Sequence, residues 1–223
     1  MTKKYELTDE KIVDNSRMLY RIRALRDFGN IKAGQFGGFI EQESNLSHEG
    51  NCWICDNAKV TEHAIVKDDA FVCENALICN TAVVANKAIV SGFAIVSAGS
   101  YILDHSKVFG NARILGSVIK DYSVVSGEAW IEDAKIYGIS HICGNAKIRN
   151  YDDYLVVGPI GSRYDYTTFM KTSNGKIWVK CGCFEGTIEE FRAEVKDYHR
   201  SDYKSLSEYL NAMNLAEHKL LMR

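Results

Sequence analysis

The sequence has no excess of charge of either sign. Its 223 residues include 27 lysines and arginines against 29 aspartates and glutamates, which gives a formal net charge of −2. A protein that binds nucleic acid or an anionic membrane through its overall charge carries a surplus of basic residues. We therefore expect neither nucleic acid nor a membrane as a partner. Hydrophobic residues make up 46% of the chain, which is typical of a folded protein and not of a disordered one.

The chain also lacks long apolar segments, since no run approaches the ~18–20 residues that a membrane-spanning helix needs. Met1-Thr2-Lys3-Lys4 leads into Tyr5-Glu6-Leu7-Thr8, which is not the apolar core of a signal peptide. Both absences predict a protein that stays in the cytoplasm where it is made. The seven cysteines agree with this location, because an odd number without an export signal favours reduced thiols.

Complete sets of metal-ligand residues are lacking as well. Cys52 and Cys55 have the C-x-x-C spacing of half a zinc site, but Cys52 falls at an inward position of the repeat described next. Cys181 and Cys183 would need two further ligands, and the sequence does not indicate which residues these would be. We therefore predict no metal site and no cofactor.

The chain does contain one short sequence motif that is repeated between residues 52 and 148. A small residue, mostly Ala or Ser, is followed two positions later by Val or Ile, and four mostly polar or turn-forming residues complete the period of six. This period does not fit a helical face, whereas two inward residues separated by one outward residue form a short β-strand. Gly, Asn and Asp are frequent between the strands and would turn the chain.

The repeat resembles the hexapeptide-repeat family, which folds as a left-handed parallel β-helix with three units in each triangular coil. About seventeen units would make roughly five to six coils, or about 25–30 Å at ~4.8 Å per coil. Two units, Ser117/Ile119 and Ala134/Ile136, arrive one residue early and are three units apart. We expect them to stack on the same corner of adjacent coils.

Different elements flank the repeat in this mainly β chain. Residues 1–45 predict a β-hairpin cap that would cover the open end of the first coil, and residues 46–150 form the β-helix. Residues 151–223 predict an α+β module of three strands and two helices. Within this module, Thr187 and Glu190 have the spacing of a capping box, which would begin a helix at about Ile188.

The outward strand positions are apolar in seven successive units, although polar residues are expected where a strand faces water. These positions hold Ile65, Phe71, Leu77, Val83, Ile89, Ile95 and Tyr101. Stacking by eighteen residues distributes them over all three outer faces, and apolar rows of this kind need cover. Either the terminal segments fold back over them, or the chain forms a homo-oligomer. We favour the homo-oligomer, a dimer or a trimer.

The family resemblance implies an activity, because many hexapeptide-repeat proteins are acyl-CoA-dependent acyltransferases. These enzymes use a histidine as the general base that deprotonates an acceptor hydroxyl or amine. The candidates here are His63 and His105 at corners and His141 on an outer strand face. The coils carry no looped-out insertion of the kind that walls the clefts of such enzymes. A solvated histidine is therefore the simpler interpretation of each position, and catalysis is the alternative.

The C-terminal module indicates a ligand site of another kind. Ser162 and Arg163 lie at a predicted turn where backbone N–H groups and a guanidinium could hold a phosphate or carboxylate. The residues that could lie across the sheet from this turn are Thr167, Thr168, Cys181 and Cys183. The simpler interpretation is that the glycines here serve tight turns and the cysteines pack. A ligand at this site would be anionic, such as a small nucleotide.

Two segments of this module, Gly158-Pro159-Ile160-Gly161-Ser162-Arg163 and Cys181-Gly182-Cys183-Phe184, are similar to segments of uncharacterised phage and prophage-associated proteins. This resemblance implies a non-catalytic binding protein that inhibits a host defence system. The inhibitor would act by binding a host protein or by sequestering a nucleotide. We predict this binding role from the sequence, with the hexapeptide-repeat acyltransferase as the alternative.

Overall fold

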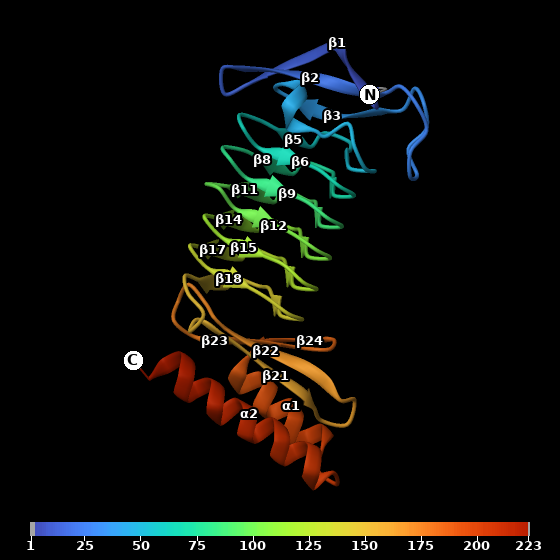
Figure 1. Cartoon of the computed structure of the whole chain (residues 1–223). Helices are drawn as coiled ribbons and strands as arrows, with labels where there is room; N and C mark the ends of the chain where they lie inside the picture. Colours follow the sequence, from blue (N-terminus) through green and yellow to red (C-terminus); the bar gives the residue numbers. More distant parts are fainter. Residues whose placement is uncertain (1–2, 223) are drawn as a thin grey trace.

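The protein is a column of stacked coils with a strand hairpin at one end and two helices at the other (Figure 1). A computed structural model describes residues 3–222. The N-terminus lies at the hairpin end and the C-terminus at the helix end (Figure 1). The column is a left-handed parallel β-helix of about six turns, so the fold class predicted from the repeat is confirmed.

Within residues 3–222, seventeen strands of two or three residues form the three faces of the column. The first face contains β5 (Lys59–Val60), β8 (Leu77–Ile78), β11 (Ile95–Ser97), β14 (Arg113–Leu115), β17 (Trp130–Glu132) and β20 (Lys147–Ile148). The second face contains β4 (Trp53–Ile54), β7 (Phe71–Val72), β10 (Ile89–Val90), β13 (Lys107–Val108), β16 (Val124–Val125) and β19 (His141–Ile142). The third face contains β6 (Ile65–Val66), β9 (Val83–Val84), β12 (Tyr101–Ile102), β15 (Val118–Ile119) and β18 (Lys135–Ile136).

The inward residues of the repeat fill the interior of the column, where nearly all of the Ala, Val and Ile side chains are inaccessible to solvent. Several units have Ser in place of Ala, and these serines are equally buried. Their hydroxyls donate to backbone carbonyls, as Ser100 Oγ does to Ser97 O (2.5 Å) and Ser106 Oγ to Leu103 O (2.6 Å). A buried hydroxyl without a partner would destabilise the core, so these bonds explain why Ser is tolerated.

The corners depend on residues in the left-handed backbone region, which Gly, Asn and Asp adopt most readily. Asp104 (φ 57°) and Asp121 (φ 61°) occupy equivalent corner positions on neighbouring coils. Asp104 Oδ2 accepts a hydrogen bond from Asp121 N (3.2 Å), and Asp121 Oδ2 accepts one from Gly138 N (2.8 Å). Each corner side chain therefore caps a backbone group of the next coil and helps to hold the coils in register.

The two shortened repeat units lie at the same corner of adjacent coils, as their spacing predicted. β14 and β17 are neighbours on the first face, with Leu115 opposite Glu132. Asp133 N donates to Leu115 O (3.0 Å), and Ala134 N donates to Ser117 Oγ (3.0 Å). Because both coils shorten at one corner, they remain superimposable.

The N-terminal segment forms the predicted hairpin and extends the first face beyond the first coil. It contains β1 (Tyr5–Asp14), β2 (Arg17–Ala24), β3 (Phe36–Ile40) and a single 3-10 turn (Glu43–Asn45). β1 and β2 are antiparallel, β2 and β3 are antiparallel, and β3 is parallel to β5. The outward side chain of Trp53 is fully buried beneath this segment, with its ring centroid 5.3 Å from that of Phe28.

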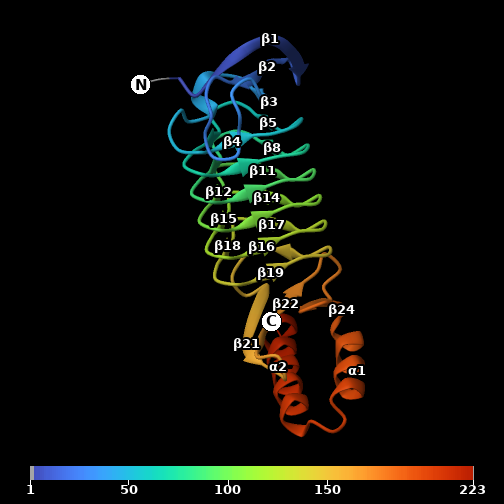
Figure 2. The ribbon, with the colours of Figure 1, turned by 90° about the vertical axis from the view of Figure 1, so that its right-hand side faces the viewer.

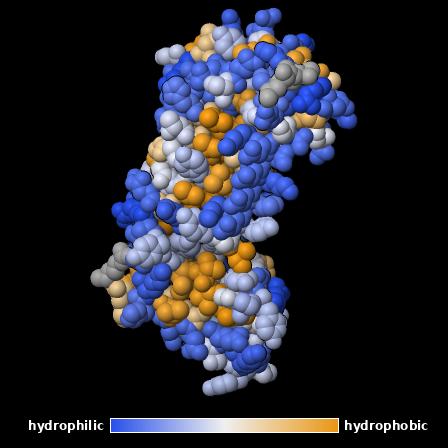
Figure 3. Space-filling view, in the orientation of Figure 1, coloured by the Kyte–Doolittle hydropathy of each residue, from blue (hydrophilic) through white to orange (hydrophobic). Residues whose placement is uncertain are grey.

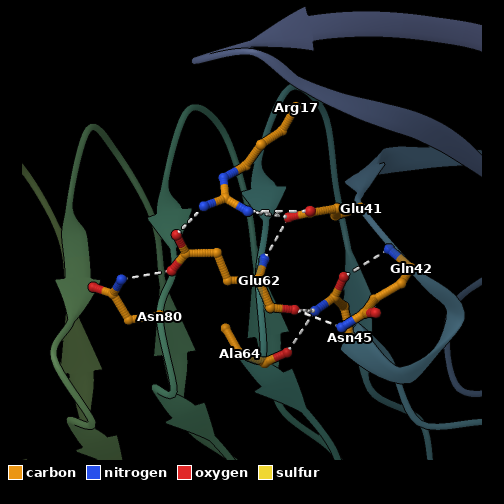
Figure 4. Close-up of polar contacts among 7 residues, drawn as sticks. All are labelled: Arg17, Glu41, Gln42, Asn45, Glu62, Ala64 and Asn80. Carbon is orange, nitrogen blue, oxygen red and sulfur yellow. Dashed lines mark hydrogen bonds and ion pairs between the residues drawn. The ribbon is translucent and has the colours of Figure 1, made fainter.

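A cluster of charged and amide side chains fastens the hairpin to the column (Figure 4). The Arg17 guanidinium pairs with Glu41 (3.2 Å) and with Glu62, and Glu62 also accepts from Asn80 Nδ2 (2.5 Å). Asn45 Nδ2 donates to Glu62 O (2.9 Å) and to Ala64 O (2.8 Å), just before β6. The cluster thus joins β2, the segment after β3 and two successive coils.

At the other end, an antiparallel sheet lies between the last coil and the helices (Figures 1 and 2). The described part of this module contains β21 (Tyr154–Ile160), β22 (Asp165–Lys171), β23 (Ile177–Cys181), β24 (Phe184–Thr187), α1 (Ile188–Tyr198) and α2 (Tyr203–Leu221). The prediction of three strands was wrong, because Phe184–Thr187 forms a fourth. The predicted capping box is confirmed, since Thr187 and Glu190 exchange hydrogen bonds at the start of α1.

Side chains of β22 alternate between the two neighbours of this sheet. Thr168 Oγ1 accepts from His141 N (3.1 Å) and Met170 Sδ accepts from Cys143 N (3.2 Å), so these residues cover the last coil. Phe169 points to the opposite side and joins the apolar cluster of α1 and α2. The sheet therefore closes the open end of the column with one face and carries the helices on the other.

Gly110 and Gly138 provide a matched test of the coil stacking, because both have positive φ (74° and 73°). A Cβ on Gly110 would lie 2.9 Å from Gly127 N in the next coil, whereas no described atom lies within 4 Å of a Cβ on Gly138. We expect Gly110→Ala to lower the free energy of unfolding by about 2–4 kcal/mol and Gly138→Ala by about 1 kcal/mol. Denaturant unfolding monitored by circular dichroism measures both; equal losses would contradict the close stacking.

Candidate functional sites

A hollow of about 150 Å³ opens between the sheet and the two helices of the C-terminal module. Four of the six residues predicted to bind a ligand line it. Ser162 and Arg163 come from the turn after β21, Cys181 ends β23, and Cys183 lies in the turn between β23 and β24. These two turns are brought together because β21, β22, β23 and β24 are consecutive neighbours in one sheet.

The two threonines predicted for the same site lie on opposite faces of β22. Thr167 is buried beneath the hollow and donates from Oγ1 to Cys181 Sγ (3.2 Å). Thr168 faces the last coil, where it accepts the hydrogen bond of the His141 backbone. The alternation of side chains along a strand makes this separation unavoidable for consecutive residues.

Aromatic rings from both helices form the walls of the hollow, which we call the ring pocket. The Phe191 ring centroid lies 4.9 Å from that of Phe184 and 5.6 Å from that of Tyr209, and the His199 ring lies 5.4 Å from the Tyr209 ring. Cys181 Sγ approaches the Tyr209 hydroxyl at 3.9 Å. Burial raises the pKa of Tyr209 above its usual value, so its hydroxyl stays protonated.

Sequence reasoning did not find the residues of the helices that line the ring pocket. His199 and Tyr209 are separated by ten positions, and neither has a motif that marks it. The helical spacing of Leu206, Leu210 and Met213 indicated only a packed face. In the structure Tyr209 and Met213 are buried, whereas Leu206 and Leu210 are half-buried. Only the packing of α1 against α2 places these rings around one space.

Two of the three candidate histidines lie at exposed corners, as predicted. His63 borders a hollow of about 410 Å³ that is lined by polar and charged side chains, including Arg17, Glu41 and Glu62. The His105 ring stacks on the ring of Tyr122, with centroids 4.9 Å apart and an angle of 15° between the planes. Both imidazoles are exposed, and no described strand or helix of the C-terminal module covers either ring.

His141 differs, because the C-terminal sheet covers part of its ring. It lies on β19, half-buried, in a hollow of about 370 Å³ between the last coil and the strands β22 and β23. The lining residues are Ile139, Asp165, Tyr166, Thr168, Lys180 and Gly182. We call this space the His141 hollow. The His141 Nε2 atom lies 3.5 Å from Ser126 Oγ.

Burial and the nearby Lys180 ammonium hold the pKa of His141 below its usual value, while Glu185 opposes this shift. Lys180 and Glu185 also form an ion pair at 3.7 Å. A histidine with a lowered pKa is unprotonated at neutral pH, and its imidazole can then accept a proton. Of the three histidines, His141 therefore has the environment best suited to a general base.

The seven apolar outward residues form rows on the faces to which the eighteen-residue spacing assigned them. Val83 lies between Ile65 and Tyr101 on the third face, Phe71 beside Ile89 on the second, and Leu77 beside Ile95 on the first. The side chains of Ile65, Ile89 and Tyr101 are 39%, 38% and 46% exposed. The terminal elements lie at the ends of the column (Figures 1 and 2), and apolar surface runs along its length (Figure 3).

The described residues include neither a cluster of metal-ligating side chains nor a membrane-spanning helix. Residues 3–222 contain no group of three or more His, Cys, Asp or Glu side chains placed to hold a metal ion. Over the same range, neither helix is both long and apolar enough to cross a membrane.

Comparison with known proteins relates part of the chain to an acetyltransferase. No protein-family model matches the sequence. A stretch of 62 residues is 39% identical to the uncharacterised acetyltransferase YdcK of Escherichia coli strain K12. The match covers 24% of this chain and 19% of that protein, so the chain spans about a fifth of the length of this relative.

Proposed function

We propose that this protein is an acyltransferase of the hexapeptide-repeat type and that His141 is its general base. The observation that carries the proposal is the half-buried His141 imidazole in a hollow that Lys180 also lines, where burial and this ammonium lower the pKa of His141. The left-handed β-helix and the 39% identity to a protein named as an acetyltransferase support the reaction class. Structures of this fold serve several functions, so the site and not the fold decides the proposal.

In the proposed reaction, the His141 imidazole removes the proton from an acceptor hydroxyl or amine held in the hollow. The freed oxygen or nitrogen attacks the carbonyl carbon of an acyl thioester, here acyl-CoA. The C–S bond breaks as the new C–O or C–N bond forms, and the departing CoA thiolate takes up the proton from the His141 imidazolium, which restores the neutral imidazole. Lys180 lines the same space, and its ammonium favours the negative charge that develops on the carbonyl oxygen.

We also propose that the chain forms a homo-oligomer through the third face. This face carries two of the three most exposed members of the apolar rows, Ile65 and Tyr101, with Val83 between them. Residues with large apolar side chains that repeat along a flat face are typical of an interface between subunits. The structure of one chain leaves this row open along the column.

The binding role that we predicted from the sequence stays a prediction. The comparisons offer no support for an inhibitor of host defence, and they name an acetyltransferase, which fits the alternative. The resemblance to phage and prophage-associated proteins and the cytoplasmic location likewise stay predictions.

Substitution of His141 tests the proposed base. We expect His141→Gln to lower the rate of CoA release from acetyl-CoA about 10²–10⁴-fold, because no base would then remove the proton from the substrate hydroxyl or amine. The assay uses a thiol reagent and a panel of amine and hydroxyl acceptors. His105→Gln is the matched control and should retain the wild-type rate, since that ring lies at an exposed corner. A His141→Gln variant as active as the wild type would contradict the assignment.

The pH dependence of the same reaction tests the role of Lys180. The unprotonated imidazole is the active form, so the rate falls as the pH drops through the pKa of His141. Lys180→Gln removes a cation that lowers this pKa, and we expect the acid limb of the pH–rate profile to move to higher pH. Glu185→Gln should move it to lower pH. Unchanged profiles in both variants would show that another group titrates.

Light scattering tests the proposed oligomer. We expect the wild type to have two or three times the mass of the 25.1 kDa chain. Charges on the third face, in the double variant Ile65→Glu/Tyr101→Glu, should return it to one chain because like charges would meet across the interface. Ile89→Glu on the second face is the control and should leave the mass unchanged. A wild-type mass of 25.1 kDa would contradict the proposal.

A further inference from the structure

The ring pocket and the His141 hollow lie on opposite faces of the same sheet, so the ring pocket is not explained by the proposed acyl transfer. Its volume of about 150 Å³ matches a cavity that accommodates one benzene-sized ring. Phe184, Phe191, His199 and Tyr209 provide ring faces and edges around this space. These rings pack directly on one another, and the faces and edges that they turn towards the pocket can pack on an aromatic guest face to face or edge to face.

Polar groups also line the pocket. The Cys181 thiol, the Tyr209 hydroxyl and the His199 ring all line it, and His199 is only 8% exposed. The buried Thr167 hydroxyl donates a hydrogen bond to Cys181 Sγ and so fixes the position of the thiol. Such a lining accepts a bare aromatic ring and can also form a hydrogen bond with a ring hydroxyl.

Opposite charges line the mouth of the pocket and do not neutralise each other. Arg163 lies on the turn after β21, and Glu194 lies on α1. Among residues 3–222, neither side chain belongs to an ion pair with N···O of 4.0 Å or less, although fourteen such pairs occur elsewhere. The nearby carboxylate of Asp165 accepts a hydrogen bond from Tyr166 N (2.7 Å).

We propose that the ring pocket binds an aromatic α-amino acid. The ring occupies the space between the helices and the sheet, the carboxylate pairs with Arg163 and the ammonium pairs with Glu194. A zwitterion satisfies both charges at once, whereas a phosphate would meet the carboxylates of Asp165 and Glu194. This inference replaces the purely anionic ligand that the turn at Ser162 and Arg163 indicated from sequence.

Three ligands with the same ring, with cytidine monophosphate as a pyrimidine nucleotide for comparison, test the proposal by isothermal titration calorimetry on the 223-residue chain. L-Phenylalanine carries both charges, 3-phenylpropionate lacks the ammonium and 2-phenylethylamine lacks the carboxylate. We expect L-phenylalanine to bind at least about ten-fold more tightly than either analogue, because each analogue leaves one pocket charge unpaired. Equal affinities for all three, no binding of any, or tighter binding of a pyrimidine nucleotide would each overturn the proposal.

Two substitutions assign the charges. Arg163→Gln should weaken both L-phenylalanine and 3-phenylpropionate about ten-fold, and Glu194→Gln should weaken L-phenylalanine but not 3-phenylpropionate. Lys196→Gln, which removes an exposed charge elsewhere on α1, is the matched control and should change neither affinity. His141→Gln should also leave L-phenylalanine binding unchanged, so a failure of acyl transfer and a failure of this site are distinguishable. Wild-type affinities in both charge variants would contradict the assignment.

Discussion

The stacking of each coil on the next is the constraint on which the rest of the structure depends. Backbone N–H groups of one coil donate to carbonyls of the next coil, seventeen residues later from Ile89 N to Ser106 O (3.0 Å) and sixteen residues later, across a shortened unit, from Lys107 N to Ser123 O (3.0 Å). The ladder continues where the spacing of paired residues changes from eighteen (Ile95 with Arg113) to seventeen (Arg113 with Trp130), and the shortened unit at Gly116 is matched by one at Asp133 on the next coil. The ladder requires small inward residues beside each corner and left-handed residues at the corners themselves.

A stack of this kind has two open ends, and both proposed sites belong to the cover of the second end. The hairpin and Trp53 close the first end. At the other end β22 lies on the last coil through Thr168 and Met170, which leaves its opposite face to receive α1 and α2. The cover encloses His141 on one side and the ring pocket on the other. A structural need for closure has thus created two partly enclosed spaces, both of which have Asp165 and Gly182 in their lining.

The column was predictable from the sequence because a period of six has one structural solution, and every unit repeats the same information. The fourth strand of the C-terminal sheet was not, because Phe184–Thr187 is short and contains Gly186, which is uncommon within strands. The turn at Ser162 and Arg163, which lines the ring pocket, could be recognised from its glycine and its charge. The difference between His141 and the other two histidines, His63 and His105, could not be recognised. It arises because the C-terminal sheet covers His141, and the repeat pattern does not indicate where that sheet lies. His199 and Tyr209 could not be assigned to the ring pocket from the sequence either, because only the packing of α1 against α2 brings them together.

The central claim is that closure of the column holds His141 unprotonated in a space where an acceptor can lie. A titration of the histidine side chains by NMR, with His141 assigned by comparison with His141→Gln, measures this directly. The account predicts that His141 titrates below about 6.5, the usual value for histidine, in the intact protein. A pKa at or above that value would show that the cover does not disfavour the charged imidazole, and it would contradict this claim.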